Sequence, residues 1–379
     1  MFRILVVFGT RPEAIKMAPL ICELHKHDEL ETFICVTSQH QQMLDQVLEI
    51  FQITPDFDLK AMTNRQTLTD ITIRVLHGME QVLEQVKPDL VLVHGDTTTT
   101  LSVSLAAVYR KIDVGHIEAG MRTHQKYLPY PEELNRRLVA CLADLHFAPT
   151  HKEASHLYRE GISKESVYIT GNTAIDVLKM TIHENYEHPL LEQVQGKKMI
   201  LITAHRRENL GEPMDHMFRA IRRLVETHSD VVAVFPIHLN PIIREKANIL
   251  LQSHPRILLT DPLDVIEFHN IAARSYFILT DSGGIQEEAP TIQVPVLVMR
   301  DITERPEVVN VGAAKLVGTL EKRIFEEGSF LIKDKNAYQS MRGIINPYGD
   351  GEASKRIVQG ILHHYGLADY LPSPFDSGG

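Results

Sequence analysis

Short apolar runs rich in Val, Ile and Leu alternate with amphipathic stretches along almost the whole chain. These runs lack the polar alternation of half-exposed strands, which is typical of strands buried on both faces of a parallel sheet. Strands and helices that alternate in this way indicate an α/β fold, here with two doubly wound Rossmann-like sheets. The predicted strands are Ile4–Phe8, Phe33–Thr37, Leu90–His94, Val114–Glu118, Leu145–Ala148, Val167–Thr170, Met199–Ala204, Val231–Ile237, Ile257–Thr260, Tyr276–Thr280 and Val294–Met299.

The boundary between the two sheets is predicted near Gly171, which divides the chain into a first domain, 1–170, and a second domain, 171–352. A turn-rich break then precedes a final helix, which is predicted at about 353–365. The tail after Leu371 contains two Pro and two Gly, and we expect it to be mobile.

Helical patterns fill the intervals between strands, for example at Pro12–His27 and Glu212–Thr227. Thr10 with Glu13 three residues later has the pattern of a capping box, and Pro12 lies in the first turn, where its missing N–H is tolerated. A helix is therefore predicted to begin directly after the first buried strand, where ligand-binding residues of such folds usually lie.

Composition excludes several classes of protein. Among the 379 residues 44% are hydrophobic and 23% are charged, which is typical of globular proteins and excludes disordered and fibrous chains. The net charge of −10 predicts no nucleic-acid partner, because such binders carry a basic surplus. Three cysteines without metal-like spacing indicate a reduced, cytoplasmic protein. No apolar run approaches the roughly 18 residues that cross a bilayer, so no membrane association is expected.

Cofactor motifs are also missing from the sequence. No Gly-x-Gly-x-x-Gly follows a strand and there is no Walker loop, which argues against a tightly held dinucleotide and against ATP. The 20 histidines show no metal-ligand spacing, and the segment 183–188 does not match His-Glu-x-x-His. Asp56-Phe57-Asp58 is interpreted as a turn rather than as a metal site. We therefore expect neither a metal nor another cofactor.

Unusual polar clusters follow the predicted strands, and ligands of open α/β sheets bind beyond these carboxyl ends. One cluster alone fits an ordinary turn and helix cap. Six of them, three from each half, predict a cleft between two facing domains. The clusters are Gly9–Glu13 with Lys16, His94–Thr100, Glu118–Gly120 with Arg122 and Pro131–Arg136, Ala204–Asn209, Pro236–His238, and Asp281–Gly284.

The cluster at Asp281–Gly284 opens a helix whose free N–H groups and dipole favour a phosphate, although a plain serine cap fits equally well. Glu287 and Glu288 lie one turn later, where a carboxylate can accept both hydroxyls of a ribose or simply favour the helix start. Arg11 and Lys16 face the same predicted cleft from the first half and can bind phosphate oxygens.

Three carboxylates are candidates for acid/base chemistry. Asp96 is either reactive or the N-cap of the Thr-rich helix that follows it. Glu118 ends an apolar strand, where a bare carboxylate is costly unless it has a partner or a task. Glu132 follows the rigid segment Pro129–Pro131, which can hold a side chain over a cleft. Acids that converge on one pocket indicate proton transfer.

The ordered set of motifs resembles the bacterial non-hydrolysing UDP-N-acetylglucosamine 2-epimerases, from about residue 3 to residue 365. Each motif is short, but the set is specific. The motifs are Gly9-Thr10-Arg11-Pro12-Glu13, His94-Gly95-Asp96-Thr97-Thr98, His116-Ile117-Glu118-Ala119-Gly120, Pro131-Glu132-Glu133, Ala204-His205-Arg206-Arg207-Glu208-Asn209, Asp281-Ser282-Gly283-Gly284-Ile285-Gln286-Glu287-Glu288 and Thr303-Glu304-Arg305-Pro306-Glu307.

The resemblance implies a GT-B fold, with the last helix crossing back to the first domain. It also implies a homodimer that interconverts UDP-N-acetylglucosamine (UDP-GlcNAc) and UDP-N-acetylmannosamine (UDP-ManNAc) without a redox cofactor, supplying cell-surface polysaccharide. Carried over by motif, the catalytic set is Arg11, Lys16, Asp96, Glu118, Glu132 and His205. The UDP-binding set is Arg11, Ser282, Gly283, Gly284 and Glu288. A second, activating UDP-GlcNAc would bind at Gln39, Gln42, Arg65, Gln66 and His238.

Some positions depart from the family's usual pattern. Gln41 stands where an Arg commonly follows Gln-His, beside the activator set. His124 and Leu128 replace a Gly and a Ser in the loop before Glu132. Ile302 replaces a Thr, and the run Val308–Val311 replaces Gly-x-Glu-Ala. None of these changes removes a side chain of the implied catalytic set.

The chemistry explains why such residues are needed. The C2 proton of the sugar is not next to a carbonyl carbon, so direct enolisation is not possible. Expelling UDP from C1 while that proton is removed gives a glycal, which is then protonated from the opposite face. This route needs proton-transfer groups on both faces and cations at the departing diphosphate. The alternatives are a GT-B glycosyltransferase, a hydrolysing epimerase that releases free sugar, and a UDP-GlcNAc sensor without turnover.

Overall fold

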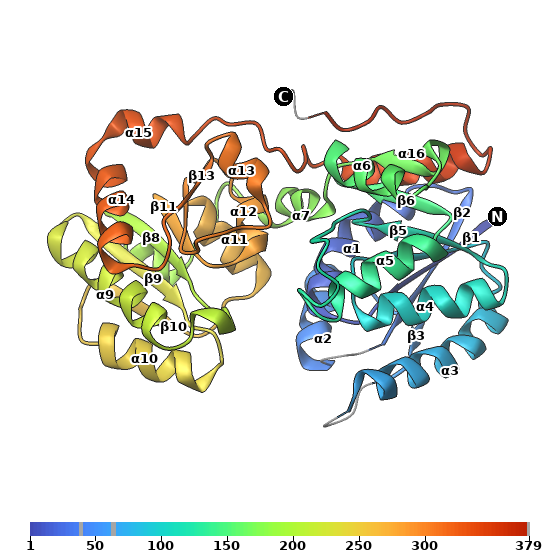
Figure 1. Cartoon of the computed structure of the whole chain (residues 1–379), viewed down its shortest axis with the longest axis horizontal. Helices are drawn as coiled ribbons and strands as arrows, with labels where there is room; N and C mark the ends of the chain where they lie inside the picture. The colour runs from blue at the N-terminus through green and yellow to red at the C-terminus, as the bar shows by residue number, and fades with distance from the viewer. Residues whose placement is uncertain (38–40, 62–65, 377–379) are drawn as a thin grey trace. The chain divides into compact units, whose positions relative to one another are not determined.

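The computed structural model describes residues 1–37, 41–61 and 66–376, the side chains of 41–43 excepted. The chain divides into two compact units, and each is a parallel sheet with its helices (Figure 1). Of the described residues, the first unit contains Met1–Val177 and 348–376, and the second contains Leu178–Pro347. The chain therefore leaves the first unit after Val177 and returns to it after Pro347.

The first unit is built on a 7-stranded parallel sheet with the order β3-β2-β1-β4-β5-β6-β7. Its strands are β1 (Phe2–Phe8), β2 (Leu30–Val36), β3 (Phe57–Asp58), β4 (Leu90–His94), β5 (Asp113–Ile117), β6 (Leu145–Ala148) and β7 (Val167–Ile169). Its helices are α1 (Arg11–Leu24), α2 (Gln41–Ile50), α3 (Leu68–Val86), α4 (Thr98–Tyr109), α5 (Glu132–Leu142), α6 (His151–Arg159), the start of α7 (Thr173–Thr181) and α16 (Ala353–His364), with a short 3₁₀ turn, η1 (Lys164–Ser166).

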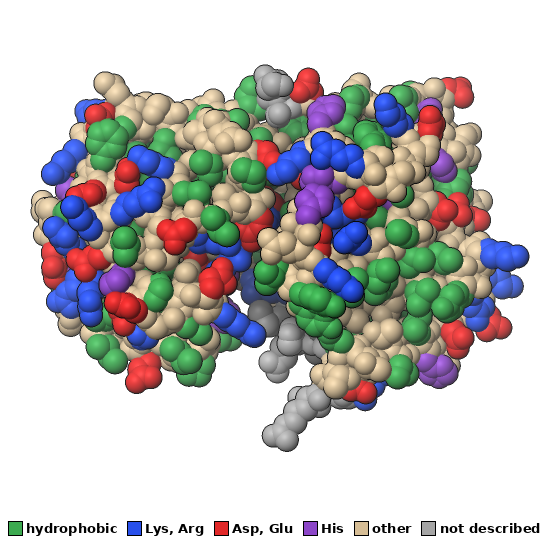
Figure 2. All heavy atoms as spheres, in the orientation of Figure 1, with side chains coloured by type: hydrophobic (Ala, Val, Ile, Leu, Met, Phe, Trp, Pro, Cys, Tyr) green, Lys and Arg blue, Asp and Glu red, His purple; other side chains and the backbone are tan. Residues whose placement is uncertain are grey.

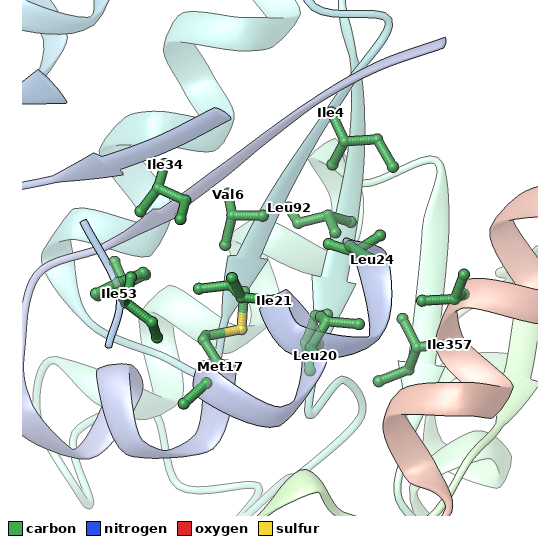
Figure 3. Close-up of a cluster of buried hydrophobic side chains, with 14 of the residues drawn as sticks. Ile4, Val6, Met17, Leu20, Ile21, Leu24, Ile34, Ile53, Leu92 and Ile357 are labelled. Atoms are coloured by element: carbon green, nitrogen blue, oxygen red, sulfur yellow. The ribbon is translucent and has the colours of Figure 1, made fainter. Parts of the chain in front are cut away.

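Alternate residues of β1 enter two different hydrophobic clusters, because successive side chains of a strand point to opposite faces. Ile4 and Val6 contribute to the cluster with α1 and α16, whereas Leu5 and Val7 contribute to the cluster with α3 and α4. Figure 3 shows the first cluster, in which the apolar face of α1 lies against the strands and Ile357 of α16 lies beside Leu20. Both faces of the sheet are therefore covered, as the unbroken apolar runs predict.

The C-terminal helix α16 is joined to the first unit by more than apolar packing. The carboxylate of Asp176 accepts hydrogen bonds from the backbone N–H groups of Ala353 and Ser354, at 3.1 and 2.7 Å. These are two of the N–H groups that a helix leaves unsatisfied at its start. A buried carboxylate at this end also complements the helix dipole.

The second unit has a 6-stranded parallel sheet with the order β10-β9-β8-β11-β12-β13. Its strands are β8 (Lys198–Thr203), β9 (Val231–Pro236), β10 (Ile257–Thr260), β11 (Phe277–Thr280), β12 (Val296–Val298) and β13 (Ala314–Leu316). Its other elements are α8 (Pro189–Gln193), η2 (Arg207–Asn209), α9 (Glu212–Thr227), α10 (Pro241–Leu251), α11 (Val265–Ala273), α12 (Gly283–Glu288), α13 (Pro306–Asn310), α14 (Glu321–Lys333) and α15 (Lys335–Ser340).

The predicted α/β fold with two doubly wound parallel sheets is confirmed. Two short strands were not predicted, β3 and β13, because runs of 2 and 3 residues at a sheet edge carry no apolar pattern. The interpretation of Asp56–Asp58 as a turn was thus wrong for Phe57 and Asp58, which form β3.

The mobility of the tail stays a prediction, but its described part, which ends at residue 376, makes specific contacts with the first unit. Phe375 is only 3% exposed, and its backbone N–H donates to the carbonyl of Ile169 at 2.8 Å. The guanidinium of Arg356 also lies over the Phe375 ring, 5.7 Å from its centroid. One aromatic side chain therefore contacts the first unit from within this proline-containing segment.

The surface carries charges of both signs. Figure 2 shows Lys and Arg side chains interspersed with Asp and Glu over each unit on the face in view, without a broad basic area. This distribution agrees with the net charge of −10. Across the described residues, no helix combines the length and the apolar character that crossing a membrane requires.

Replacing Ile357 by Ala tests the packing of α16 on α1. The side chain is fully buried, so we expect the free energy of unfolding to fall by about 2 to 5 kcal/mol. Leu371→Ala is the matched control, because Leu371 is 65% exposed and its truncation should change stability by less than about 0.5 kcal/mol. Denaturant unfolding of the two variants measures this, and equal losses would contradict the described packing.

Candidate active site

The strand order places the ends of three strands of the first sheet side by side. β1 pairs with β4, and β4 pairs with β5, although the chain reaches β2 and β3 before β4. The order therefore reverses between β1 and β4, and ligands of open parallel sheets bind beyond the carboxyl ends at such a point. Arg11 follows β1, Asp96 follows β4 and Glu118 follows β5, so three predicted site residues lie at this edge.

Glu118 occupies a backbone conformation that side chains rarely adopt, with φ of +63°. A non-glycine residue in the left-handed region is held there by its surroundings and often marks a functional position. The Glu118 carboxylate forms an ion pair and hydrogen bond with the ammonium of Lys16. Its Oε2 also accepts a hydrogen bond from the side-chain amide of Asn172 at 3.0 Å. These contacts fix the carboxylate at the end of β5.

His94 lies behind this carboxylate as a neutral group. Its ring is 4% exposed, and Nε2 lies 3.7 Å from Oε2 of Glu118 without a hydrogen-bond partner among the described residues. Burial lowers the pKa of His94 to about 4, although the nearby carboxylate of Glu118 opposes the shift. The charges of Lys16 and Asp96 also act on this pKa, so His94 lies within electrostatic range of the main polar groups at this edge.

Asp96 is paired with a cation from α5. Nη2 of Arg136 lies 2.5 Å from Oδ2 of Asp96, and the side-chain amide of Asn135 donates to the Asp96 backbone carbonyl at 2.8 Å. The alternative that Asp96 is the N-cap of α4 was wrong. Thr97 holds that position, and its hydroxyl accepts the N–H of Thr100 at 3.1 Å. The Asp96 carboxylate is consequently not committed to the helix start.

Glu132 is the first residue of α5 and precedes Asn135 and Arg136 by three and four positions. Residues at these spacings share a helix face, so Glu132 belongs to the face of α5 that reaches Asp96. One of its carboxylate oxygens, Oε2, is buried and has no hydrogen-bond partner among the described residues. A buried polar atom without a partner is costly, and it marks a place where a ligand or a proton can bind.

Glu13 connects the loops after β1 and β4. Its buried carboxylate accepts four hydrogen bonds, from the N–H groups of Gly9 and Thr10 and from the hydroxyls of Thr97 and Thr100, at 2.8 to 3.2 Å. Burial raises the pKa of Glu13, and the hydrogen bonds oppose that rise. The predicted capping box is confirmed. The Glu13 carboxylate also holds the loop after β4 through the hydroxyls of Thr97 and Thr100.

Arg11 lies next to this junction as the first residue of α1. Its side chain is partly exposed and makes no ion pair with the part of the chain that the structure describes. A guanidinium at a helix start, without a carboxylate partner, is suited to bind a phosphate.

The second unit repeats this arrangement between β8 and β11, which are paired at the reversal point of its sheet. Asp281 follows β11 and is fully buried. Its carboxylate accepts hydrogen bonds from the backbone N–H groups of His205 and Arg206, at 3.0 to 3.1 Å, and from the amide of Asn209 at 3.0 Å. Asp281 thereby fixes the loop that presents His205.

His205 itself is partly open to solvent, with 42% of its side chain exposed. Its ring stacks on His238 with centroids 5.9 Å apart, and its Nδ1 lies 3.6 Å from Oδ1 of Asp281. Desolvation lowers the pKa of His205, while the charge of Asp281 opposes the shift. The stacking on His238 and the contact with Asp281 hold the ring in place.

Three arginines surround Glu304 near the start of α12. Arg206 and Arg300 pair with its carboxylate at 3.1 and 2.6 Å, and Arg305 lies 3.9 Å away. Burial alone would raise the pKa of Glu304, but a backbone hydrogen bond and the three guanidinium charges outweigh it and lower the pKa to about 2. A β-carbon added at Gly283 would meet the Arg305 guanidinium at 3.4 Å. Cations therefore lie directly at this glycine.

Three residues predicted to hold UDP, namely Ser282, Gly283 and Gly284, lie at this same helix start, and Glu288 ends the same helix. Ser282 is the N-cap of α12 but makes no capping hydrogen bond through its side chain, so its hydroxyl is not used by the helix. Gly283 and Gly284 form its first turn. Glu288 is partly exposed, with Oε2 3.6 Å from Nε2 of His269. Glu287 is instead buried and paired with Arg305 at 2.7 Å, so the structure separates two acids that the sequence treats alike.

Of the predicted activator set, Gln39 and Arg65 lie outside the described residues, and the side chain of Gln42 is not described either. The same holds for the side chain of Gln41, the departing residue beside them. Gln66 is partly buried at the start of the next described segment. His238 is exposed and stacks on His205. These two residues belong to different units.

The other departures from the family pattern differ in environment. His124 has φ of +61°, a conformation that glycine adopts without strain, which explains why a glycine is usual there. Leu128 and Ile302 are 63% and 76% exposed, so neither packs in a core. Val308 is fully buried, and Val311 is 44% exposed. Nothing in the structure explains the exposed isoleucine at 302.

Several contributing residues were not predicted from the sequence. Asn172 follows a turn far along the chain from Glu118, and no local pattern marks it. Arg136 lies within the quoted motif, and its position four residues after Glu132 was the available signal. Within the described residues, no group of three or more His, Cys, Asp or Glu side chains is arranged to hold a metal ion.

Comparison with known proteins is consistent across sequence and structure. A family model described as UDP-N-acetylglucosamine 2-epimerase matches residues 22–362. The UDP-N-acetylglucosamine 2-epimerase of Bacillus subtilis is 55% identical over 373 residues, which cover 98% of each chain. These matches confirm the predicted resemblance and the predicted class of enzyme, an isomerase.

Solved structures agree with this. The S. aureus MnaA–UDP co-structure has a TM-score of 0.92 at 50% identity and covers 99% of this chain and all of its own. The UDP-GlcNAc 2-epimerase of Neisseria meningitidis bound to UDP-GlcNAc has a TM-score of 0.87 at 47% identity, covering 95% and 100%. A kitacinnamycin glycosyltransferase matches with a TM-score of 0.65 at 11% identity, which shows a shared fold alone. The predicted GT-B-like class is confirmed by these matches.

Acidification should destabilise the protein through three buried histidines on adjacent strands. Burial lowers the pKa to about 4 for His94, about 3 for His116 and about 4 for His146. The unfolded chain, with ordinary histidine pKa values near 6.5, binds more protons between about pH 6.5 and 4. The free energy of unfolding should therefore decrease as the pH is lowered through this window, by about 1.4 kcal/mol per pH unit for each histidine.

Denaturant unfolding at several pH values measures this slope. His116→Gln keeps a donor for the Gly95 carbonyl that His116 contacts at 2.7 Å, and it should lower the slope by about 1.4 kcal/mol per pH unit. His77→Gln is the control, because His77 is 77% exposed and its replacement should leave the slope unchanged. An unaltered slope in the His116 variant would contradict the account.

Proposed function

The chain belongs to the UDP-N-acetylglucosamine 2-epimerase family, and on that premise we propose that it interconverts UDP-GlcNAc and UDP-ManNAc without releasing free sugar. The observation that supports this best is the group of carboxylates at the reversal point of the first sheet. Asp96 and Glu118 each have a cation partner there, and Glu132 has a buried oxygen without one among the described residues.

The proposed reaction is an elimination followed by an addition. The bond between C1 and the phosphate oxygen breaks, and UDP leaves with the electron pair. A base removes the C2 proton, and the electrons of that C–H bond form the C1–C2 double bond of 2-acetamidoglucal. Return of a proton to the other face of C2, with attack of UDP at C1, then gives the epimer. No electron acceptor is needed, because the addition returns the proton and the UDP that the elimination removes.

The carboxylates divide this work. In the two epimers the C2 hydrogen lies on opposite faces of the ring, so one fixed base cannot serve both, and two proton-transfer groups act in turn. Glu132 suits proton transfer because its buried oxygen has no partner in the described structure. Asp96 and Glu118 supply the second group and a positioning charge, and each carboxylate is paired with a cation, Arg136 and Lys16 respectively.

Cations stabilise the departing diphosphate. Arg11 is available at the start of α1, and Arg206 and Arg305 lie at Gly283. Stabilising charge that develops on a leaving group is often the largest catalytic contribution, up to about 4 kcal/mol for one donor. The spare hydroxyl of Ser282 adds a hydrogen bond, and Glu288 accepts the ribose hydroxyls. His205 lies at the end of β8 in the same unit and assists at the phosphate.

One assay separates the alternatives, namely incubation with UDP-GlcNAc alone and identification of the products. The proposal predicts UDP-ManNAc at equilibrium with UDP-GlcNAc. A hydrolysing epimerase would give UDP and free N-acetylmannosamine instead. A glycosyltransferase without an acceptor, or a sensor, would leave UDP-GlcNAc unchanged. Release of free sugar and unchanged UDP-GlcNAc would each overturn the proposal.

The family resemblance supports further parts of the proposal. The enzyme is a cytoplasmic homodimer, its product supplies N-acetylmannosamine for cell-surface polysaccharide, and it needs no cofactor. A second UDP-GlcNAc activates it through Gln39, Gln42, Arg65, Gln66 and His238. Traces of UDP-GlcNAc should then accelerate the reverse reaction, and hyperbolic kinetics with UDP-ManNAc alone would contradict this regulation.

Neutral replacements test the carboxylates. Asp96→Asn, Glu118→Gln and Glu132→Gln should each lower kcat by about 10²- to 10⁴-fold, because each removes a charge or a proton-transfer group from the elimination. UDP affinity should change little. Glu165→Gln is the control, since Glu165 is exposed on η1 and should not affect the rate. A Glu132 variant with normal kcat would refute its assigned role.

Glu288→Ala tests the nucleotide half. Loss of a charged hydrogen-bond acceptor to the ribose should weaken UDP binding by about 10- to 100-fold. Glu226→Ala is the matched control in the same unit, because Glu226 lies on α9 and pairs with Arg222. Isothermal titration with UDP measures both variants, and equal affinity in the two would contradict the assignment.

A further inference from the structure

Glu133 is a buried carboxylate without a role in the proposed reaction, and it holds the loop before α5 by two backbone hydrogen bonds. Its side chain is fully buried. The N–H of Thr123 donates to Oε2 at 3.0 Å, and the N–H of His124 donates to Oε1 at 3.1 Å. Both oxygens are therefore bound to the loop 121–131. His124 keeps its left-handed conformation at this contact, so the hydrogen bond stabilises a strained residue.

The same carboxylate also contacts the cation that neutralises Asp96. Nη1 of Arg136 lies 3.5 Å from Oε2 of Glu133, and Nη2 of the same guanidinium lies 2.5 Å from Oδ2 of Asp96. A guanidinium is planar and rigid, so its two ends move as one body. Any displacement of Arg136 toward Glu133 thus changes its contact with Asp96.

Further contacts hold the beginning of the loop. Arg122 makes a two-point contact with Glu160, at 2.8 and 2.7 Å, and the Thr123 hydroxyl donates to the Leu128 carbonyl at 2.5 Å. Tyr127 and Tyr130 near its tip are 63% and 57% exposed. The tip is therefore in contact with solvent, while the start is bound to α5 and α6.

Electrostatics links these contacts. A buried carboxylate is stable only while its charge is balanced by hydrogen bonds or a cation. If the loop withdraws the two N–H groups, the Arg136 guanidinium is the charged partner that remains for Glu133. Closer pairing of Glu133 with Arg136 would then weaken the pairing of Arg136 with Asp96.

We propose that Glu133 is a positioning residue that couples the loop 121–131 to the Asp96 carboxylate through Arg136. This proposal rests on the proposed function only in assigning Asp96 to the reaction. The alternative is that Glu133 merely favours the start of α5, as an acid in a first helical turn does. A helix-start acid would act on stability and not specifically through Asp96.

Glu133→Gln tests the coupling, because glutamine keeps the shape and one carbonyl acceptor but removes the charge. We expect kcat to fall by about 10- to 100-fold, with UDP affinity unchanged. The amides of Thr123 and His124 should exchange faster with deuterium, and trypsin should cleave faster after the exposed Lys126. Unchanged kcat in a folded Glu133→Gln protein would overturn the proposal.

Combining variants separates coupling from a general structural effect. In an Asp96→Asn background, Glu133→Gln should lower kcat by less than about twofold further, because its path through Asp96 is already broken. Arg136→Lys should lower kcat like Glu133→Gln while leaving cleavage after Lys126 slow, and it tests the same link if Glu133→Gln does not fold. Fully additive losses of kcat in the double variant would refute the coupling.

The matched control is Glu160→Gln, which loosens the other anchor of the same loop. It should speed cleavage after Lys126 but change kcat by less than about threefold, because Glu160 has no contact with Arg136 or Asp96 among the described residues. A kcat loss as large as that of Glu133→Gln would show that loop anchoring alone matters and would overturn the proposal. Normal activity of Asp96→Asn would instead refute the proposed function, whatever the Glu133 variant does.

Discussion

The reversal of strand order between β1 and β4 is the constraint on which the site of the first unit depends. Parallel pairing of β1 with β4 and of β4 with β5 brings three strand ends to one edge of the sheet. Each strand is buried on both faces, so polar side chains are concentrated in the loops beyond these ends. Arg11, Asp96 and Glu118 lie together because the hydrophobic core aligns the strands that precede them.

The carboxylates at this edge differ in whether a cation or a hydrogen-bond donor contacts them, and this difference suits them to different tasks. Glu118 is held by Lys16 and Asn172, and Asp96 is held by Arg136. Glu132 keeps a buried oxygen without a partner in the described structure. The second unit follows the same principle, since the carboxylate of Asp281 accepts backbone N–H groups while three arginines surround the carboxylate of Glu304.

The fold was predictable, and so were the positions of many polar residues beyond the strands, because buried parallel strands and the loops after them leave local patterns. The spacing of unbroken apolar runs along the chain predicts both sheets. The pair Thr10 and Glu13 predicts the start of the first helix. Long-range partners were not predictable. Asn172 reaches Glu118 only through tertiary packing, and β13 is too short to show a pattern. Phe375 shows the same limit, because no local pattern predicts that this side chain is buried.

The central claim is that the sugar passes through a C1–C2 alkene whose C2 proton exchanges with solvent. Incubation of UDP-GlcNAc with the protein in heavy water, followed by proton NMR, tests this most directly. The account predicts deuterium at C2 of both UDP-GlcNAc and UDP-ManNAc, and release of 2-acetamidoglucal together with UDP when elimination outpaces re-addition. UDP-ManNAc that forms with its original C2 protium would contradict elimination with solvent exchange.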